Sequence, residues 1–173
     1  MVEWTGARYA DGPSAEVETW VGAPPERVWA IVSDIEAMPA MSPELQSVAW
    51  CDAGGGGPAV GRGFTGTNRH PAMGEWTTTS HIVECEPARA FAWAVGDPER
   101  PGATWRFTLE PDDGGTLLRQ WMRMGPGRSG LSQAIDRMPE KEQKIVFVRL
   151  REHERAMTGT VAAIKELAER GGR

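Results

Sequence analysis

The longest regular pattern in the sequence is helical and lies near the carboxyl end, from about residue 139 to about residue 170. Apolar residues recur there every three or four positions, which is the spacing of one face of an α-helix. That face comprises Val146, Leu150, His153, Met157, Val161, Ile164 and Ala168. A helix of about thirty residues is about 45 Å long at about 1.5 Å per residue. Its apolar face has to be buried against a partner of similar length, and this requirement constrains the rest of the chain.

The middle of the sequence supplies such a partner, because it reads as a series of strands separated by turns. Segments of alternating or β-branched residues flank turns such as PDDGG at 111–115, which is a hairpin signal. The expected strands cover residues 16–21, 47–51, 60–69, 75–86, 91–95, 103–110 and 116–124. After the first strand, Pro24 and Pro25 introduce a helical pattern, and a second short piece follows. We therefore expect an α+β fold in which the terminal helix covers the apolar face of an antiparallel sheet.

Length, charge and cysteine content narrow the class of protein. A chain of 173 residues is most simply one domain, expected over residues 15–170 after a flexible lead-in at residues 1–14. The net charge is −5 and no basic cluster is present, so we expect no nucleic-acid partner. The sequence contains neither an apolar run of membrane-spanning length nor a signal-peptide pattern, which predicts no membrane span and a cytoplasmic location. Cys51 and Cys85 are too few for a disulfide framework, in keeping with a reducing compartment.

The stretch GRGFTG at residues 61–66 has the G-x-G-x-x-G spacing of a dinucleotide-binding loop. Such a loop joins a strand to a helix whose N-terminus holds the pyrophosphate, whereas a threonine-rich strand pattern follows here. The glycines are better interpreted as a bend in the sheet. Three scattered histidines and two distant cysteines do not form a zinc pattern, and no G-x-S-x-G motif occurs. We therefore expect neither a metal nor a cofactor.

Four longer phrases carry a family resemblance. They are APPERVWAIVSDIEAMP (23–39), TNRHPAMGEW (67–76), VECEPARAFAW (83–93) and TWRFTLEPDDGGTLL (104–118). Together they resemble the SRPBCC superfamily, which includes START lipid-transfer domains, birch-pollen-type allergens and polyketide cyclase/dehydrase proteins. The similarity spans about residues 15–168 and is closest to bacterial members of the polyketide cyclase/dehydrase type.

This resemblance implies the helix-grip fold, in which a curved seven-stranded antiparallel sheet wraps around a long C-terminal helix. Two short helices follow the first strand, and sheet and helix enclose an elongated, largely apolar cavity. Relatives bind lipids, sterols or polyketides, and some cyclise and dehydrate aromatic polyketides. Because one fold supports many activities, the resemblance does not choose among them.

Strand alternation predicts which side chains face the terminal helix. Asn68 shares the face of Phe64, His81 shares the face of Cys85, and His153 lies within the apolar face of the helix. The expected ligand-cavity residues are Met41, Phe64, Asn68, Trp93, Trp105, Phe107, Gln120, Met122 and Met157. His81 and His153 are the candidate catalytic residues, because an imidazole can remove a proton beside a carbonyl while an amide holds the enolate oxygen.

Three functions remain open on the sequence alone. A carrier or sensor of a small hydrophobic ligand, such as a lipid or a polyketide-like molecule, needs only apolar walls. A polyketide aromatase/cyclase or dehydratase also needs acid–base groups; the alternative for His81 and His153 is that each is an ordinary buried polar side chain. An interaction module would need an exposed apolar patch, for example around Trp4 or Trp121. His70 is expected at the surface, and the protein is expected to be a monomer or a homodimer.

Overall fold

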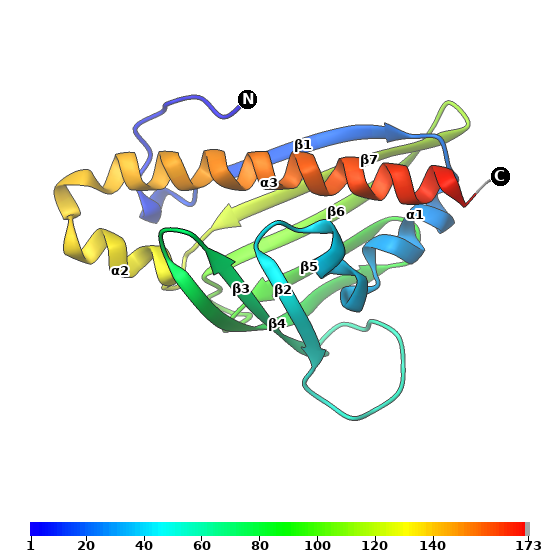
Figure 1. Ribbon diagram of the computed structural model, residues 1–173, viewed down its shortest axis with the longest axis horizontal. Coiled ribbons are helices and arrows are strands. Elements are labelled where there is room, and N and C mark those ends of the chain that lie inside the picture. Colours follow the sequence, from blue (N-terminus) through cyan, green and yellow to red (C-terminus); the bar gives the residue numbers. More distant parts are fainter. Residues whose placement is uncertain (172–173) are drawn as a thin grey trace.

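The computed structural model describes residues 1–171 and consists of one seven-stranded antiparallel sheet with a long helix along one face (Figure 1). The strands are β1 (Ser14–Val21), β2 (Leu45–Trp50), β3 (Gly63–His70), β4 (Gly74–Glu86), β5 (Ala90–Val95), β6 (Ala103–Asp112) and β7 (Gly115–Met124). The α-helices are α1 (Pro25–Val32), α2 (Gly130–Arg137) and α3 (Glu142–Arg170), and the 3-10 helices are η1 (Tyr9–Asp11), η2 (Ile35–Met41) and η3 (Pro139–Lys141). The strand order is β1-β7-β6-β5-β4-β3-β2. The expected helix-grip α+β fold is confirmed.

Helix α3 packs against β1 and β7 and runs in the same direction as β1 (Figure 1). On the other side of α3, strands β2, β3 and β4 curl toward the helix. We call the sheet face toward α3 the concave face and the opposite one the convex face. Two hydrophobic clusters pack between the concave face and α3. The cluster near the C-terminal half of α3 contains Val161 and Ile164, and the one near its N-terminal half contains Val146 and Leu150. The amphipathic pattern of the sequence thus predicts which side of α3 is buried.

The N-terminal segment, expected as a flexible lead-in, lies along one flank of α3, next to the buried face of the helix. The backbone N–H of Val2 donates to Glu154 at 2.7 Å, and Trp4 packs edge-on against Phe147 with ring centroids 5.2 Å apart. The Tyr9 hydroxyl lies 2.9 Å from the carbonyl oxygen of Gly102 and 2.7 Å from that of Gly127, and these two oxygens share its single proton. The division into residues 1–14 and 15–170 stays a prediction. Over residues 1–171, the structure contains no helix both long and apolar enough to cross a bilayer.

The G-x-G-x-x-G stretch forms a turn that leads into β3, with no helix after it. Gly61 has a φ of 88°, and its N–H donates to the carbonyl oxygen of Ile82 at 2.8 Å. The Arg62 guanidinium lies 3.6 Å from the Trp50 ring centroid and donates to Asp52 and to carbonyl oxygens of the preceding glycine-rich loop. These contacts occupy the arginine with protein groups, and the stretch leads into β3 instead of forming the strand-to-helix turn of a dinucleotide site.

Candidate functional site

The centre of the concave face is built from two tryptophans on adjacent strands. Trp93 on β5 pairs with Trp105 on β6, and their rings stack with centroids 6.4 Å apart at an interplanar angle of 12°. His153 on α3 meets the Trp105 ring edge-on at a centroid distance of 5.1 Å. All three side chains remain partly accessible although they lie on the covered face. They are therefore not fully enclosed between sheet and helix, and we call the region that these three side chains border the recess.

The floor of the sheet beside the recess carries one buried amide. Gln120 on β7 lies opposite Phe107 on β6 and Val17 on β1, and it is 5% exposed. Its Oε1 atom is buried and has no hydrogen-bond partner among the described residues. Buried polar groups are usually paired, because an unpaired one loses its bonds to water without replacement. Gln120 is thus an exception within an otherwise apolar part of the sheet.

His153 is held in its neutral form by its surroundings. Burial lowers its pKa well below the ordinary value of 6.5, and the electrostatic influence of the nearby Arg149 and His70 side chains lowers this pKa further. An imidazole that carries no charge at neutral pH can accept a proton, provided that a substrate presents one within hydrogen-bond distance. No side-chain hydrogen bond ties the His153 ring to another described residue, so its nitrogen atoms are available to a ligand.

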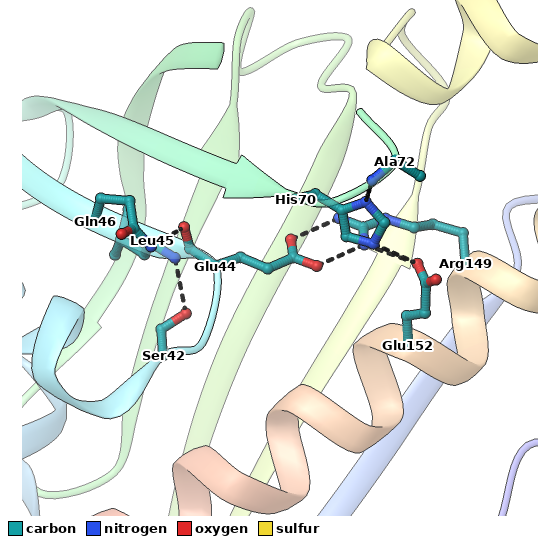
Figure 2. A network of polar contacts seen from close by, with 8 residues as sticks. All are labelled: Ser42, Glu44, Leu45, Gln46, His70, Ala72, Arg149 and Glu152. Carbon is teal, nitrogen blue, oxygen red and sulfur yellow. Dashed lines mark hydrogen bonds and ion pairs between the residues drawn. The ribbon is translucent and has the colours of Figure 1, made fainter. Parts of the chain in front are cut away.

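A polar network closes the space between the sheet edge and α3 (Figure 2). The Arg149 guanidinium donates to both carboxylate oxygens of Glu44, at 2.6 and 2.7 Å, and to Glu152 at 3.0 Å. His70, at the end of β3, approaches the same Glu152 oxygen with Nε2 at 3.3 Å. Its Nδ1 accepts the backbone N–H of Ala72 at 3.1 Å, which leaves the proton on Nε2, where it points toward the carboxylate. The network joins β3, the segment before β2 and α3.

Two hollows have defined volumes, and neither is the elongated cavity that the resemblance implied. One of about 10 Å³ lies between the N-terminal segment and α3, lined by residues including Glu3 and Phe147. The other, of about 300 Å³, is an open depression on the outer side of α3 near Arg151 and Glu154. The recess beside Trp105 belongs to neither of them.

The structure groups the sequence-predicted site residues in two sets. The buried ones are Met41, Phe64, Phe107, Gln120, Met122 and Met157. Asn68, Trp93, Trp105 and His153 are half-buried. Asn68 lies on the concave side of β3, where its amide donates to the carbonyl oxygen of Gly66 at 3.4 Å. Whether any of these side chains contacts a ligand stays a prediction.

His81 lies on the convex face, opposite to the expected one. Its ring Nδ1 donates to the carbonyl oxygen of Gly96 at 3.1 Å, and it pairs with Gly63 and Ala94 across the sheet. The expectation extended an unbroken alternation from Cys85, but the pairing of β4 with β5 shifts register between Ile82 and Glu84. Such a bulge reverses the facing of every residue beyond it. His81 and His153 therefore belong to different faces and cannot form one catalytic pair.

The expectation for His70 was also wrong. Its side chain is 14% exposed and faces α3, because β3 extends one residue further than expected and His70 keeps the alternation of Phe64 and Asn68. The charged members of the network, Arg149 and Glu44, were not identified from the sequence. Arg149 is one position before Leu150 of the apolar stripe, and only that adjacency hinted that it is buried.

The curled sheet, the long helix that it grips and the aromatic recess between them define a helix-grip protein of the SRPBCC type. Residues 2–160 match the model of the family described as polyketide cyclase/dehydrase and lipid transport. The chain belongs to this family. Among curated proteins the sequence has no significant match.

Solved structures agree on the fold. A polyketide-cyclase-like protein of Corynebacterium glutamicum is 29% identical with a TM-score of 0.65, and the match covers 90% of this chain and 91% of that one. The Zhui aromatase/cyclase of a Streptomyces species is 18% identical with a TM-score of 0.69, covering 93% and 96%. The two-domain aromatase/cyclase StfQ of the steffimycin biosynthetic pathway is 17% identical with a TM-score of 0.71, covering 92% of this chain and 52% of StfQ. The last two, at this identity, support the fold alone.

Proposed function

We propose that the protein binds a small, mostly apolar molecule with aromatic or fused rings in the recess, as a carrier or sensor. The observation that carries this proposal is the stacked pair Trp93 and Trp105, which stays partly accessible beneath α3. An apolar ligand that covers accessible aromatic surface removes this surface from water, and this burial makes a favourable contribution to the free energy of binding. The family description, which includes lipid transport and polyketide chemistry, supports the same class of ligand.

Binding of a multi-ring ligand requires the recess to widen, since ligand sites for such molecules have volumes of about 300–1,000 Å³. The neighbouring side chains favour this, because Met122 and Met157 pack close to Trp105 in the same cluster and thioether side chains adapt to irregular shapes. Entry is proposed to be between α3 and the sheet edge formed by β2 and β3, where Arg149 pairs with Glu44 before β2 and Glu152 with His70 at the end of β3. Opening there breaks ionic contacts and leaves the hydrophobic clusters in place.

The proposal is tested first by what the protein carries. Organic extraction of the purified protein, followed by mass spectrometry, is expected to release an apolar molecule in amounts that approach the protein concentration. Titration with an apolar fluorescent probe is then compared between Trp105→Leu and Trp121→Leu. Trp121 faces the convex side, opposite to its neighbours Gln120 and Met122, so its replacement is the matched control. Equal probe affinity in both variants would place the site elsewhere.

A second candidate function is an aromatase/cyclase or dehydratase, and His153 favours it. Its imidazole is neutral, lies against Trp105 and is free of side-chain bonds to other described residues, as a proton acceptor for an aromatic substrate requires. Two structural neighbours are described as aromatase/cyclases. Incubation with poly-β-ketone precursors is expected to give regiospecific cyclised product from the wild type and none from His153→Phe. Unchanged product patterns in the variant, together with tight ligand uptake, would favour the carrier.

A further inference from the structure

Gln120 carries, among the described residues, the one fully enclosed side-chain oxygen or nitrogen atom that has no hydrogen-bond partner. Thr116, on the same strand and face, donates to the carbonyl oxygen of Ala23 at 2.7 Å. Ser33 donates to the carbonyl oxygen of Trp29 at 2.7 Å, and the Arg149 guanidinium is paired with two carboxylates. Gln120 Oε1 alone is buried without a hydrogen bond among the described residues. Folding gains nothing from this amide that an apolar side chain of the same size would not supply.

The position of Gln120 is at the boundary between the two hydrophobic clusters. Its neighbours on the same face of β7 are Leu118, in the cluster with Val161, and Met122, in the cluster with Met157. Met122 on β7 is opposite Trp105 on β6. Gln120 is two residues before Met122 on the same strand, which places its backbone about 7 Å from that of Met122 along the sheet. The amide is therefore within reach of a molecule of two or more rings that lies on Trp105.

We propose that Gln120 is the polar recognition group of the recess and selects ligands that carry a neutral hydroxyl, as in a phenol or an enol. This inference rests on the proposed function and specifies its ligand. An amide can present either its carbonyl oxygen or its NH₂ group after a half turn, and a hydroxyl can pair with both because it donates and accepts. A carboxylate is a poorer fit, since Arg149, a cation one turn before His153, is already paired with Glu44 and Glu152.

The test compares 2-naphthol with 2-methoxynaphthalene, which have the same ring system but differ in the donor hydroxyl. Affinities are measured by isothermal titration calorimetry and by quenching of tryptophan fluorescence. The wild type is expected to bind 2-naphthol about tenfold more tightly, as one additional hydrogen bond provides. In Gln120→Met this preference is expected to fall to about twofold or less, through weaker naphthol binding at unchanged affinity for the methyl ether. Thermal unfolding of the variant checks that it is folded, and Gln120→Leu repeats the comparison.

The outcomes separate the inference from the proposed function. If both compounds bind the wild type with equal affinity, or if both variants keep the full preference for 2-naphthol, Gln120 is not the recognition group while the ligand site stands. If neither compound binds the wild type, the proposed ligand site fails, and the inference fails with it. If the preference disappears in both variants and persists in Trp121→Leu, the assignment of Gln120 is supported.

Discussion

Arg149 and Glu44 meet in a two-point ion pair although 105 residues separate them in the sequence. Arg149 projects from α3 and is 7% exposed, and Glu44 lies immediately before β2 at the far edge of the sheet. The pair therefore ties the helix to the last strand of the sheet, on the side where His70 and Glu152 complete the network (Figure 2). This connection joins the open edge of the sheet to α3.

Replacement of Glu44 by glutamine is expected to lower the free energy of unfolding by about 2–4 kcal/mol, because the buried guanidinium loses its principal counter-ion. The measurement is urea denaturation, and the double variant Glu44→Leu with Arg149→Met is expected to recover most of the loss. Glu75→Gln, which breaks the exposed pair with Arg69, is the control and is expected to cost less than about 1 kcal/mol. A Glu44 variant as stable as this control would show that the buried pair is not needed for closure.

The stability of the protein is expected to decrease as the pH falls below about 6.5, because of His153. Burial lowers the pKa of His153 in the folded state. At pH values below 6.5 and above this lowered pKa, the unfolded chain binds a proton on His153 that the folded chain does not bind. Between the ordinary pKa of 6.5 and the lower folded value, this difference contributes up to about 1.4 kcal/mol of lost stability per pH unit.

His153→Phe removes this proton uptake and is expected to flatten the stability curve between pH 7.5 and pH 5. Carboxylates such as Glu84, whose pKa is lowered by its hydrogen bond to Arg106, lose their contribution only below their ordinary pKa of 4.5. Their effect is therefore separate from that of His153. Denaturant midpoints measured across this pH range would contradict the assignment if wild type and variant ran parallel.

Gln120→Met is expected to raise the free energy of unfolding of the ligand-free protein by about 1 kcal/mol, because it replaces an unpaired buried amide by an apolar side chain of similar volume. Differential scanning calorimetry of ligand-free wild type and variant measures the change. A substitution that stabilises the fold and weakens hydroxyl recognition is the pattern of a residue kept for function. A clear loss of stability would instead assign Gln120 a structural role.

Gly127 is expected to tolerate no side chain, because a Cβ there would collide with the carbonyl oxygen of Arg100. Its N–H donates to the carbonyl oxygen of Pro101 at 2.7 Å, so neither backbone segment can move aside freely. Gly127→Ala is expected to cost about 1–3 kcal/mol in urea denaturation. Gly130, at the start of α2, has open space around its Cβ position, and Gly130→Ala is the control, expected to be neutral or slightly stabilising. Equal effects would show that the loop rearranges at little cost.

The sequence predicted the order of the strands and of helices α1 and α3, and the buried side of most of them, but it did not predict α2. The stripe on α3 and the alternation on β7 report directly which side chains are apolar, and burial follows from that property. The prediction failed at His81 because a β-bulge leaves no mark in the pattern of Val83, Glu84 and Cys85. One extra residue in the pairing was enough to move a histidine to the other face.

By itself the sequence determined the class of fold, the family and the inward position of Gln120 and His153, because periodicity is a local property that each segment carries. Only the tertiary structure decided that Arg149 finds Glu44, that His70 turns toward α3, and that Gln120 is left without a partner. These relationships depend on how distant segments are brought together. Strand register and the packing of α3 on the sheet determine which distant residues meet, and the sequence pattern of a single strand or helix does not encode register or packing.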